Sequence, residues 1–439
     1  MELKLDELKE GMEIQSYLGL DERFASLDQR VCDWLTHNFP GTQVGVRRQS
    51  QTLDLAIAEL RPGDQVIRVF GFPNALQHLT TVNPKLIGEL GRQGFKRFSV
   101  NTVTGVQSKS RESKVAEVNQ LVEKAKAGAV VREHAAVAIE SLMDGLAQGV
   151  SDLKSLEPLV NSIIENTYMD AMAALATLKE SDHTYGHCVD VGAIFTGIYQ
   201  KICDKKGIPS AFKDAQETLL AALLHDVGKA KVPKEILESS VTFEKNSSEM
   251  RLMRSHPEKS GELLKEMGLP EVVVNMGMYH HLKLDGQNYS SYPKGASIEQ
   301  ASYETRLLAI IDTYQALIGR RPYKKSWTAP AAMRYIDALA GIEFDEDVFE
   351  DVISVLGLYP LGSLVELSTG QQGFVMNIPE EDVERPLIAV IIDAKGGRIT
   401  PAEMVDLEKD TEIKITKELD PVEVLGDTAL DEFTSLKVN

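Results

Sequence analysis

The sequence has 439 residues, which at roughly 150 residues per domain predicts two or three domains. A hydrophobic content of 43% and a charged content of 26% are typical of a folded globular chain and exclude a fibrous or low-complexity protein. The 47 Lys and Arg against 66 Asp and Glu give a net charge of −19, which repels polyanions and argues against a nucleic acid polymer as partner.

No segment is predicted to span a membrane. The longest apolar runs, residues 219–224 and 387–392, have six residues, whereas a bilayer requires about 20. The N-terminus carries charges from its second residue and lacks the apolar core of a secretory signal, so we expect a cytoplasmic protein. Cys32, Cys188 and Cys203 form no CxxC pair, which argues against both a disulfide framework and a thiolate zinc site.

Residues 1–105 show mixed patterns that predict a small α+β domain. An extended run at 12–14 is followed by a helical stretch at 27–35 and by strand-like segments at 44–46 and 65–70. This region lacks a cluster of His, Cys or carboxylates that would support chemistry. We therefore expect a regulatory or sensory domain that docks a signalling protein.

Helical spacing of apolar residues dominates the next two segments. In residues 106–167 the spacing predicts long helices, either a connector that transmits a signal or the opening helices of an all-α core. Residues 168–350 continue as helices with short polar connections. After residue 351, short β-type runs at 364–367, 373–376, 387–392 and 413–415 predict a small β-rich C-terminal extension, residues 351–439.

Histidine crowding is the strongest chemical signal in the chain. Six of the nine histidines lie between residues 183 and 281: His183, His187, His225, His256, His280 and His281. Two carboxylates join them, Asp226 beside His225 and Asp312 further along. Imidazole with carboxylate suits iron, manganese or zinc, so the pattern predicts a metal site in the core of a helical bundle.

Local spacing predicts how the first ligands are presented. We expect His225 and Asp226 in the last turn of a helix that begins at residue 219 and ends at Gly228. Adjacent helical side chains diverge by about 100°, so this pair could serve two metals with the carboxylate bridging them. His256 precedes Pro257, which predicts a helix start with the His256 ring turned inward.

In combination, these residues resemble the HD-GYP branch of the HD phosphohydrolase superfamily over about residues 168–350. The motifs that carry the resemblance are His225-Asp226-Val227-Gly228-Lys229, His256-Pro257, His280-His281, Asp285-Gly286, Asp312 and Arg321-Pro322-Tyr323. Residues 359–362 and 365–367 resemble the extension that commonly follows such domains. The resemblance implies a mainly α, all-helical HD-type bundle. It also implies a metal-dependent phosphodiesterase that linearises cyclic di-GMP to pGpG and often continues to GMP.

The resemblance also implies the site residues and cofactors. Metal ligation is implied for His187, His225, Asp226, His256, His280, His281 and Asp312. Asp226 and Lys229 are the implied catalytic residues, and substrate binding is implied for Lys229, Arg321, Tyr323, Asp285 and Gly286. We expect two divalent ions, iron or manganese, because a two-metal centre can clamp a phosphodiester and activate water. A homodimer is left open.

The sequence departs from the family pattern at four places. Leu282 replaces a Glu, Gln315 replaces an Asp, and His183 replaces a Glu that helps to hold a third metal in some members. In the signature loop, residues 285–293, either Tyr289 or Tyr292 takes the tyrosine position. The expected metal ligands are all present, but two alternatives follow from the altered loop: a phosphohydrolase of another nucleotide, or a receptor that binds cyclic di-GMP without cutting it.

Overall fold

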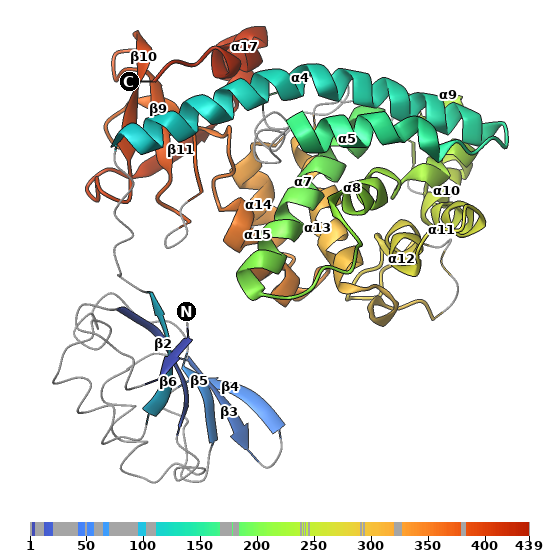
Figure 1. Ribbon diagram of the computed structural model, residues 1–439, viewed down its shortest axis with the longest axis horizontal. Helices are drawn as coiled ribbons and strands as arrows, with labels where there is room; N and C mark the ends of the chain where they lie inside the picture. Colours follow the sequence, from blue (N-terminus) through green and yellow to red (C-terminus); the bar gives the residue numbers. More distant parts are fainter. Residues whose placement is uncertain are drawn as a thin grey trace. The chain divides into compact units, whose positions relative to one another are not determined.

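The computed structural model describes residues 2–4, 13–20, 43–48, 51–56, 65–69, 95–101, 111–166, 178, 184–237, 239, 241, 243–244, 246–289, 292, 295–319, 327–378 and 383–438 (Figure 1). The chain divides into two compact units, Met1–Glu112 and Ser113–Asn439.

The described strands of the first unit form one antiparallel sheet in the order β1-β6-β2-β5-β3-β4. They are β1 (Glu2–Lys4), β2 (Glu13–Leu20), β3 (Gln43–Arg48), β4 (Gln51–Ala56), β5 (Gln65–Val69) and β6 (Phe95–Asn101). The strands predicted at 44–46 and 65–70 are therefore confirmed as β3 and β5. The predicted helix at 27–35 lies outside the described residues.

The second unit opens with helices that pack around a single core (Figure 1). They are α4 (Arg111–Ala147), α5 (Glu157–Asn166), α7 (Thr184–Lys206), α8 (Ala215–Leu223), α9 (Lys234–Leu237), α10 (Ser248–Met253), α11 (His256–Glu266), α12 (Glu271–Tyr279), α13 (Tyr303–Ile318), α14 (Ala329–Asp337) and α15 (Glu346–Leu356). Short 3-10 helices η5 (Leu153–Leu156), η6 (Val227–Lys231) and η7 (Ile298–Gln300) connect them. The predicted mainly helical bundle is confirmed.

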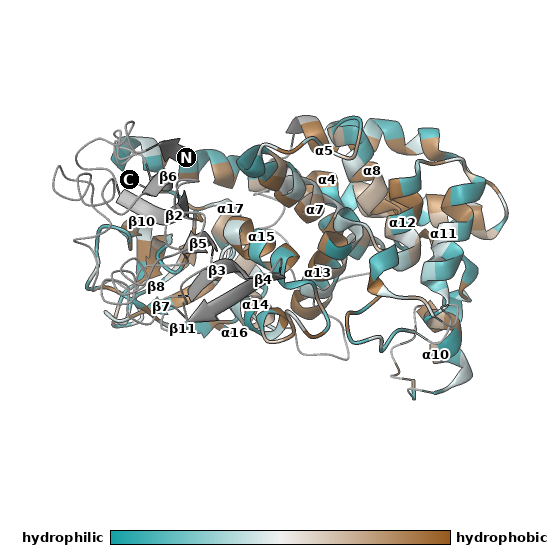
Figure 2. Cartoon of the chain, turned by 90° about the horizontal axis from the view of Figure 1, so that it is seen from below, coloured by the Kyte–Doolittle hydropathy of each residue, from teal (hydrophilic) through white to brown (hydrophobic). Residues whose placement is uncertain are grey.

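Helix starts are fixed by side chains that accept hydrogen bonds from otherwise unpaired backbone N–H groups. Asp214 accepts from the backbone N–H of Glu217 at the start of α8, and Ser302 accepts from Thr305 at the start of α13. The helices carry both hydrophilic and hydrophobic residues, as amphipathic helices around a common core do (Figure 2). Among the described residues, none of the helices is both long and apolar enough to cross a membrane.

A five-stranded antiparallel sheet in the order β10-β9-β8-β7-β11 follows the helices. Its strands are β7 (Leu364–Leu367), β8 (Gln372–Val375), β9 (Leu387–Ile392), β10 (Arg398–Asp406) and β11 (Ile415–Leu419), and helices α16 (Pro421–Leu425) and α17 (Ala429–Thr434) with the 3-10 helix η8 (Gly426–Thr428) follow. Phe374 and Phe433 belong to the same buried cluster as the helical core. The predicted β-rich extension is confirmed.

Two parts of the extension escaped the sequence patterns. Strand β10 contains Pro401 and lies at an edge of the sheet, where a missing backbone donor is tolerated. Its register against β9 shifts between Arg398 and Glu403, so the alternation of side chains is broken. The closing helices α16 and α17 have only five and six residues, too short to produce a clear helical period.

Gly228 has a different role from the one predicted. Helix α8 ends at Leu223, so His225 and Asp226 lie in the turn after it, and Gly228 lies inside η6. A Cβ at Gly228 would come within 2.1 Å of the His256 carbonyl oxygen and 2.4 Å of the Ser260 backbone nitrogen. The glycine is thus needed for the close approach of η6 to α11, and its own N–H donates to Ser260 Oγ at 2.8 Å.

We expect Gly228→Ala to lower the free energy of unfolding by about 2–3 kcal/mol, because both clashing atoms belong to backbone. The protein should also bind metal more weakly, since His225 and Asp226 directly precede η6 and His256 begins α11. The control is Gly268→Ala, where φ is 72° and the added methyl meets open space. This control should lose about 1 kcal/mol through backbone strain alone. Equal denaturation midpoints for the two variants would contradict the packing role of Gly228.

Candidate metal centre

The structure brings the side chains of all seven expected metal ligands together. Their donor atoms form three overlapping groups, each within 4.8 Å: His187, His225 and Asp312; His225, Asp226 and His280; His256, His280 and His281. The residues come from the first turn of α7, the turn after α8, the start of α11, the end of α12 and the middle of α13. Side chains from five separate segments therefore converge in the bundle.

Asp226 lies at the centre of this cluster and is 1% exposed. Its Oδ1 is 3.0 Å from His256 Nε2 and 3.8 Å from His280 Nε2. Its Oδ2 is 3.4 Å from His225 Nε2 and 3.8 Å from His187 Nε2. The two oxygens of one carboxylate thus face two different sets of histidines.

Backbone carbonyls orient three of the histidines. Nδ1 of His225 lies 2.7 Å from the Ala222 oxygen, and Nδ1 of His256 lies 2.7 Å from the Met253 oxygen. Nδ1 of His280 lies 3.0 Å from the Gly277 oxygen. Because a carbonyl only accepts, each Nδ1 carries the proton and donates, and each Nε2 is left with its lone pair available for a ligand.

Those Nε2 atoms have no hydrogen-bond partner in the described structure. The buried polar atoms without a partner include Nε2 of His225, His256 and His280, together with Oδ1 of Asp226. Four converging polar atoms without hydrogen-bond partners in a core are energetically costly unless a cation, a proton or a metal ion, lies between them. The donor set, imidazole nitrogen with carboxylate oxygen, fits a divalent transition metal.

His187 and Asp312 complete the cluster on the other side. His187 Nε2 is 2.9 Å from Asp312 Oδ1, and both side chains are buried. The other ring nitrogen of His187, Nδ1, hydrogen-bonds to the side-chain oxygen of Gln315, one turn beyond Asp312 on α13. A side-chain amide therefore orients His187, where a backbone carbonyl orients the other three rings.

Burial and the two carboxylates shift the pKa values of side chains in the cluster in different directions. Burial alone would raise the pKa of Asp226, but Lys229 and the neighbouring histidines hold it well below its usual range. Burial lowers the pKa of His225, yet Asp226 and Asp312 outweigh it and raise the pKa to about 10. Burial, reinforced by the charge on His225, lowers the pKa of His280 to about 3. Without metal, a proton on His225 therefore balances the carboxylates, while His280 is a neutral ligand.

Lys229 connects the cluster to a cavity. Its Nζ donates to Asp226 Oδ2, and it lines a cavity of about 380 Å³ between the C-terminal end of α4, the start of α7, η6 and α9. The neighbouring Lys231 donates to the Leu146 carbonyl at 2.9 Å, and Lys234 lies 3.6 Å from Glu140. The ammonium of Lys229 is thus placed between the metal-binding cluster and space that a ligand can enter.

The signature loop presents Tyr289 to the cluster. Its ring centroid is 4.7 Å from that of His281. The guanidinium of Arg254 lies over the same tyrosine ring, 5.6 Å from the ring centre. Tyr292 is buried instead in a small cluster with Leu282 and Ala301. Leu282, at the position of the family glutamate, is therefore a packing residue, and Tyr289 is the tyrosine beside the metal-binding side chains.

The other expected substrate-binding residues stand apart or lie outside the described residues. Asp285 is exposed, and its Oδ1 accepts from the backbone N–H of Gln287 at 2.9 Å, which closes its own turn. Gly286 follows it in an exposed position with φ of 71°. Residues 320–326, which contain Arg321 and Tyr323, and His183 are outside the described residues. The roles expected of these residues stay predictions.

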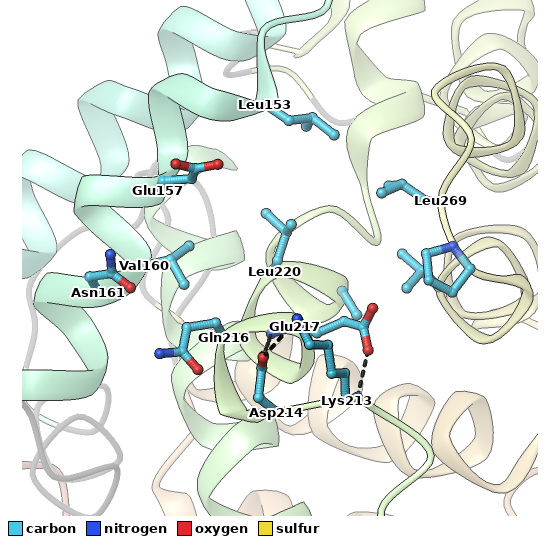
Figure 3. A pocket seen from close by; sticks show the side chains of 13 residues that line it. Leu153, Glu157, Val160, Asn161, Lys213, Asp214, Gln216, Glu217, Leu220 and Leu269 are labelled. Carbon is cyan, nitrogen blue, oxygen red and sulfur yellow. Dashed lines mark hydrogen bonds and ion pairs between the residues drawn. The ribbon is translucent and has the colours of Figure 1, made fainter.

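A second cavity, of about 330 Å³, lies between η5, α5, α8 and the start of α12, and its lining contains none of the seven expected ligands (Figure 3). Two of its carboxylates are engaged in the N-terminal cap of α8: Asp214 accepts from the backbone N–H of Glu217, and Glu217 accepts from that of Lys213. We therefore assign these charges to the stability of α8.

Sequence patterns did not identify two residues that support the expected ligands, Arg132 and Asp190. Asp190 is 1% exposed and pairs with Arg132 through two bonds of 2.5 Å, Nε to Oδ1 and Nη2 to Oδ2. Gln315 donates to the same Asp190 Oδ2 at 3.3 Å. One signal was available: Arg132 interrupts the buried stripe of α4 as a charged residue, but its partner lies 58 residues away and cannot be found from spacing.

Comparisons with known proteins agree with this geometry. The family model described as an HD domain matches residues 164–348, and the model described as a KOW domain associated with HD domain matches residues 364–426. The chain is 30% identical over 318 residues to the cyclic di-GMP phosphodiesterase PA4108 of Pseudomonas aeruginosa, which is 71% of this chain and 74% of that protein. It is 36% identical over 128 residues to the cyclic di-GMP phosphodiesterase response regulator RpfG of Xanthomonas campestris, 29% of this chain and 32% of that protein.

A more distant relative is named for another substrate. The 3′3′-cGAMP-specific phosphodiesterase 3 of Vibrio cholerae is 28% identical over 183 residues, 41% of this chain and 37% of that protein. The length and identity of the Pseudomonas match place this chain in the HD-GYP family of HD-domain phosphohydrolases. It is thus an enzyme of a class that uses divalent metals, and its His and Asp groups are suited to bind them.

We expect metal binding to release a proton. At pH 7 the metal-free protein carries a proton on His225, whose pKa is about 10, and a metal ligand must be unprotonated. The apparent affinity for Mn²⁺ should therefore rise with pH, by up to about tenfold per unit for one displaced proton. Titration calorimetry at pH 7 in two buffers of different ionisation enthalpy measures the proton directly. Identical binding enthalpies in both buffers would contradict a protonated His225.

Proposed function

We propose that this protein hydrolyses cyclic di-GMP in the cytoplasm, using two divalent ions, iron or manganese, held by the seven clustered ligands. The first cut adds water to one phosphorus and breaks its bond to the 3′ oxygen, which leaves with a proton, so the product is linear pGpG. A second cut of the same kind gives two GMP. The observation that carries the proposal is the position of Asp226, whose two oxygens face two different sets of histidines.

The ligand groups support two ions rather than one. His187 and Asp312 lie on the Oδ2 side of Asp226, His256 and His281 belong to the group on the Oδ1 side, and Asp226 belongs to a group between them. Asp226 would therefore contribute to both positions. The donors are nitrogen and oxygen without thiolate, which suits iron or manganese. When bound, such ions polarise the phosphodiester and lower the pKa of a coordinated water.

The residues of this chain supply the remaining functions. Lys229 lies beside the ligands and lines the 380 Å³ cavity, so its ammonium can pair with a non-bridging phosphate oxygen and balance the charge that develops there. Tyr289 offers an aromatic face next to His281 on which a nucleobase can stack. The buried ligands keep bulk water from the carboxylates, which strengthens their attraction for cations.

A second substrate has a specific observation in its favour. The relative named for 3′3′-cGAMP matches this chain over 183 residues, and the signature loop of this chain departs from the family pattern. Both cyclic dinucleotides present the same phosphodiester to the metal-binding residues and differ in one base. The discrimination would therefore arise in the loop that carries Tyr289.

The deciding experiment is anaerobic turnover of cyclic di-GMP and 3′3′-cGAMP by the full-length protein reconstituted with ferrous iron or manganese, with metal content measured on the same sample. We expect hydrolysis of cyclic di-GMP, and loss of both metal and hydrolysis in the His225→Ala/Asp226→Ala double variant. Retained hydrolysis in that variant would overturn the metal mechanism. A fully metallated, inactive protein that binds cyclic di-GMP would show that it is a receptor.

We expect Lys229→Met to separate metal binding from turnover. The variant should bind Mn²⁺ as tightly as the wild type or more so, because it loses a cation that contacts Asp226 Oδ2. Its kcat should fall by about 100-fold, since a charge that stabilises the reacting phosphate is gone. Lys259→Met is the control, because the hydrogen bond that its ammonium makes within the described residues goes to the Lys231 carbonyl, at 3.4 Å. Loss of Mn²⁺ from the Lys229 variant would instead assign this lysine a structural role.

Three further expectations are independent of this proposal. The protein partner of the N-terminal unit, the homodimer, and the substrate contacts of Arg321 and Tyr323 stay predictions.

A further inference from the structure

A chain of buried polar side chains connects helix α4 to the metal-binding cluster. Arg132 on α4 holds Asp190 on α7 with two bonds of 2.5 Å. Asp190 Oδ2 accepts from Gln315 Nε2 at 3.3 Å, and the oxygen of the same Gln315 amide contacts His187 Nδ1. All four side chains are at least 90% buried, and His187 Nε2 ends the chain 2.9 Å from Asp312.

The donor and acceptor properties of these groups allow one direction for the hydrogen bonds that link them. A carboxylate paired with a guanidinium can only accept, so the Gln315 amide must turn its NH₂ group toward Asp190. Its oxygen then faces His187, and Nδ1 of that ring must be the protonated nitrogen. The lone pair of His187 is consequently on Nε2, which points at the cluster. Arg132 thus influences the tautomer of His187 indirectly, through Asp190 and Gln315.

His187 differs in this respect from the rings fixed by backbone. His225, His256 and His280 donate to carbonyls three or four residues before them, so their orientation is a local property of the chain. The orientation of His187 instead depends on where α4 lies. Arg132 occupies the buried stripe of that helix between Gly128 and Ala135, whose small side chains allow close packing.

We propose that Arg132 is a positioning residue for the metal centre: through Asp190 and Gln315 it fixes the tautomer and direction of His187, so that metal affinity depends on the seating of helix α4. The inference rests on the metal centre of the proposed function and is independent of its substrate. Supporting hydrogen bonds of this kind typically change metal affinity by about 10- to 100-fold.

The test measures Mn²⁺ affinity and stoichiometry of the full-length protein by equilibrium dialysis, together with the melting temperature of the metal-free protein. Arg132→Met leaves a buried carboxylate unpaired and could fail to fold, so the deciding variant is Arg132→Met/Asp190→Asn, which removes both charges. An asparagine can donate as well as accept, so it no longer dictates the direction of the Gln315 amide. We expect this double variant to bind one Mn²⁺ about 10- to 100-fold more weakly, with Arg132→Lys in between.

A second ion pair on the same helix provides the matched control. Lys114, near the start of α4, pairs with Asp406 of β10 at 2.7 Å, and both side chains are largely buried. Lys114→Met/Asp406→Asn should alter the melting temperature while leaving the Mn²⁺ affinity unchanged. Wild-type affinity in the Arg132→Met/Asp190→Asn protein, or equal weakening in the Lys114 control, would overturn the inference. A wild-type protein that binds neither Mn²⁺ nor Fe²⁺ would refute the proposed function itself.

Discussion

The helical unit is organised around two carboxylates, Asp226 and Asp312, buried where apolar helices meet. An ionised carboxylate in a protein core is strongly destabilising unless cations or donors surround it. Here the compensation is distributed over five segments: histidines from α7, α11, α12 and the turn after α8, and Lys229 from η6. The packing of these segments can therefore be understood as the means of gathering positive or donor groups around a shared negative charge.

The same carboxylates explain how an acidic protein can accept an anionic substrate. A net charge of −19 opposes the approach of a dinucleotide, and the cluster without metal does not relieve that repulsion, because Lys229 and the protonated His225 only offset the two carboxylates. The two divalent ions of the proposed centre would make the site positive, because they would bring four positive charges to a site with two carboxylates. In this account the metal ions and Lys229 provide the attraction, so a broad basic surface is not required.

The chemistry-bearing residues were largely predictable from sequence, and their supports were not. The spacing of His225-Asp226, His256 and His280-His281 predicted donor side chains that the structure brings together, because few residue types bind metals and each motif is local. Gln315 could be recognised only as a departure from the family pattern, yet in the structure it orients His187. That role depends on Asp190 and Arg132, which lie 125 and 58 residues along the chain from their partners, and sequence periodicity carries no information about such contacts. The close contact between η6 and α11 was also not predictable from sequence. Gly228 was interpreted as the end of a helix, whereas its lack of a side chain allows η6 to touch α11.

Helix α4 is stiff, and this gives the Arg132 contact a mechanical meaning. The helix begins at Arg111, beside the boundary of the first unit at Glu112, and Arg132 lies 21 residues, or about 32 Å, along its axis. A side-chain tip lies about 5–6 Å from a helix axis, so a rotation of about 30° displaces it by about 3 Å. That displacement exceeds the 2.5 Å separation between the guanidinium and Asp190. A torque applied at the start of α4 would therefore reach the metal-binding cluster through release of the Arg132–Asp190 pair, and it would also strain the Lys114–Asp406 pair on the same helix.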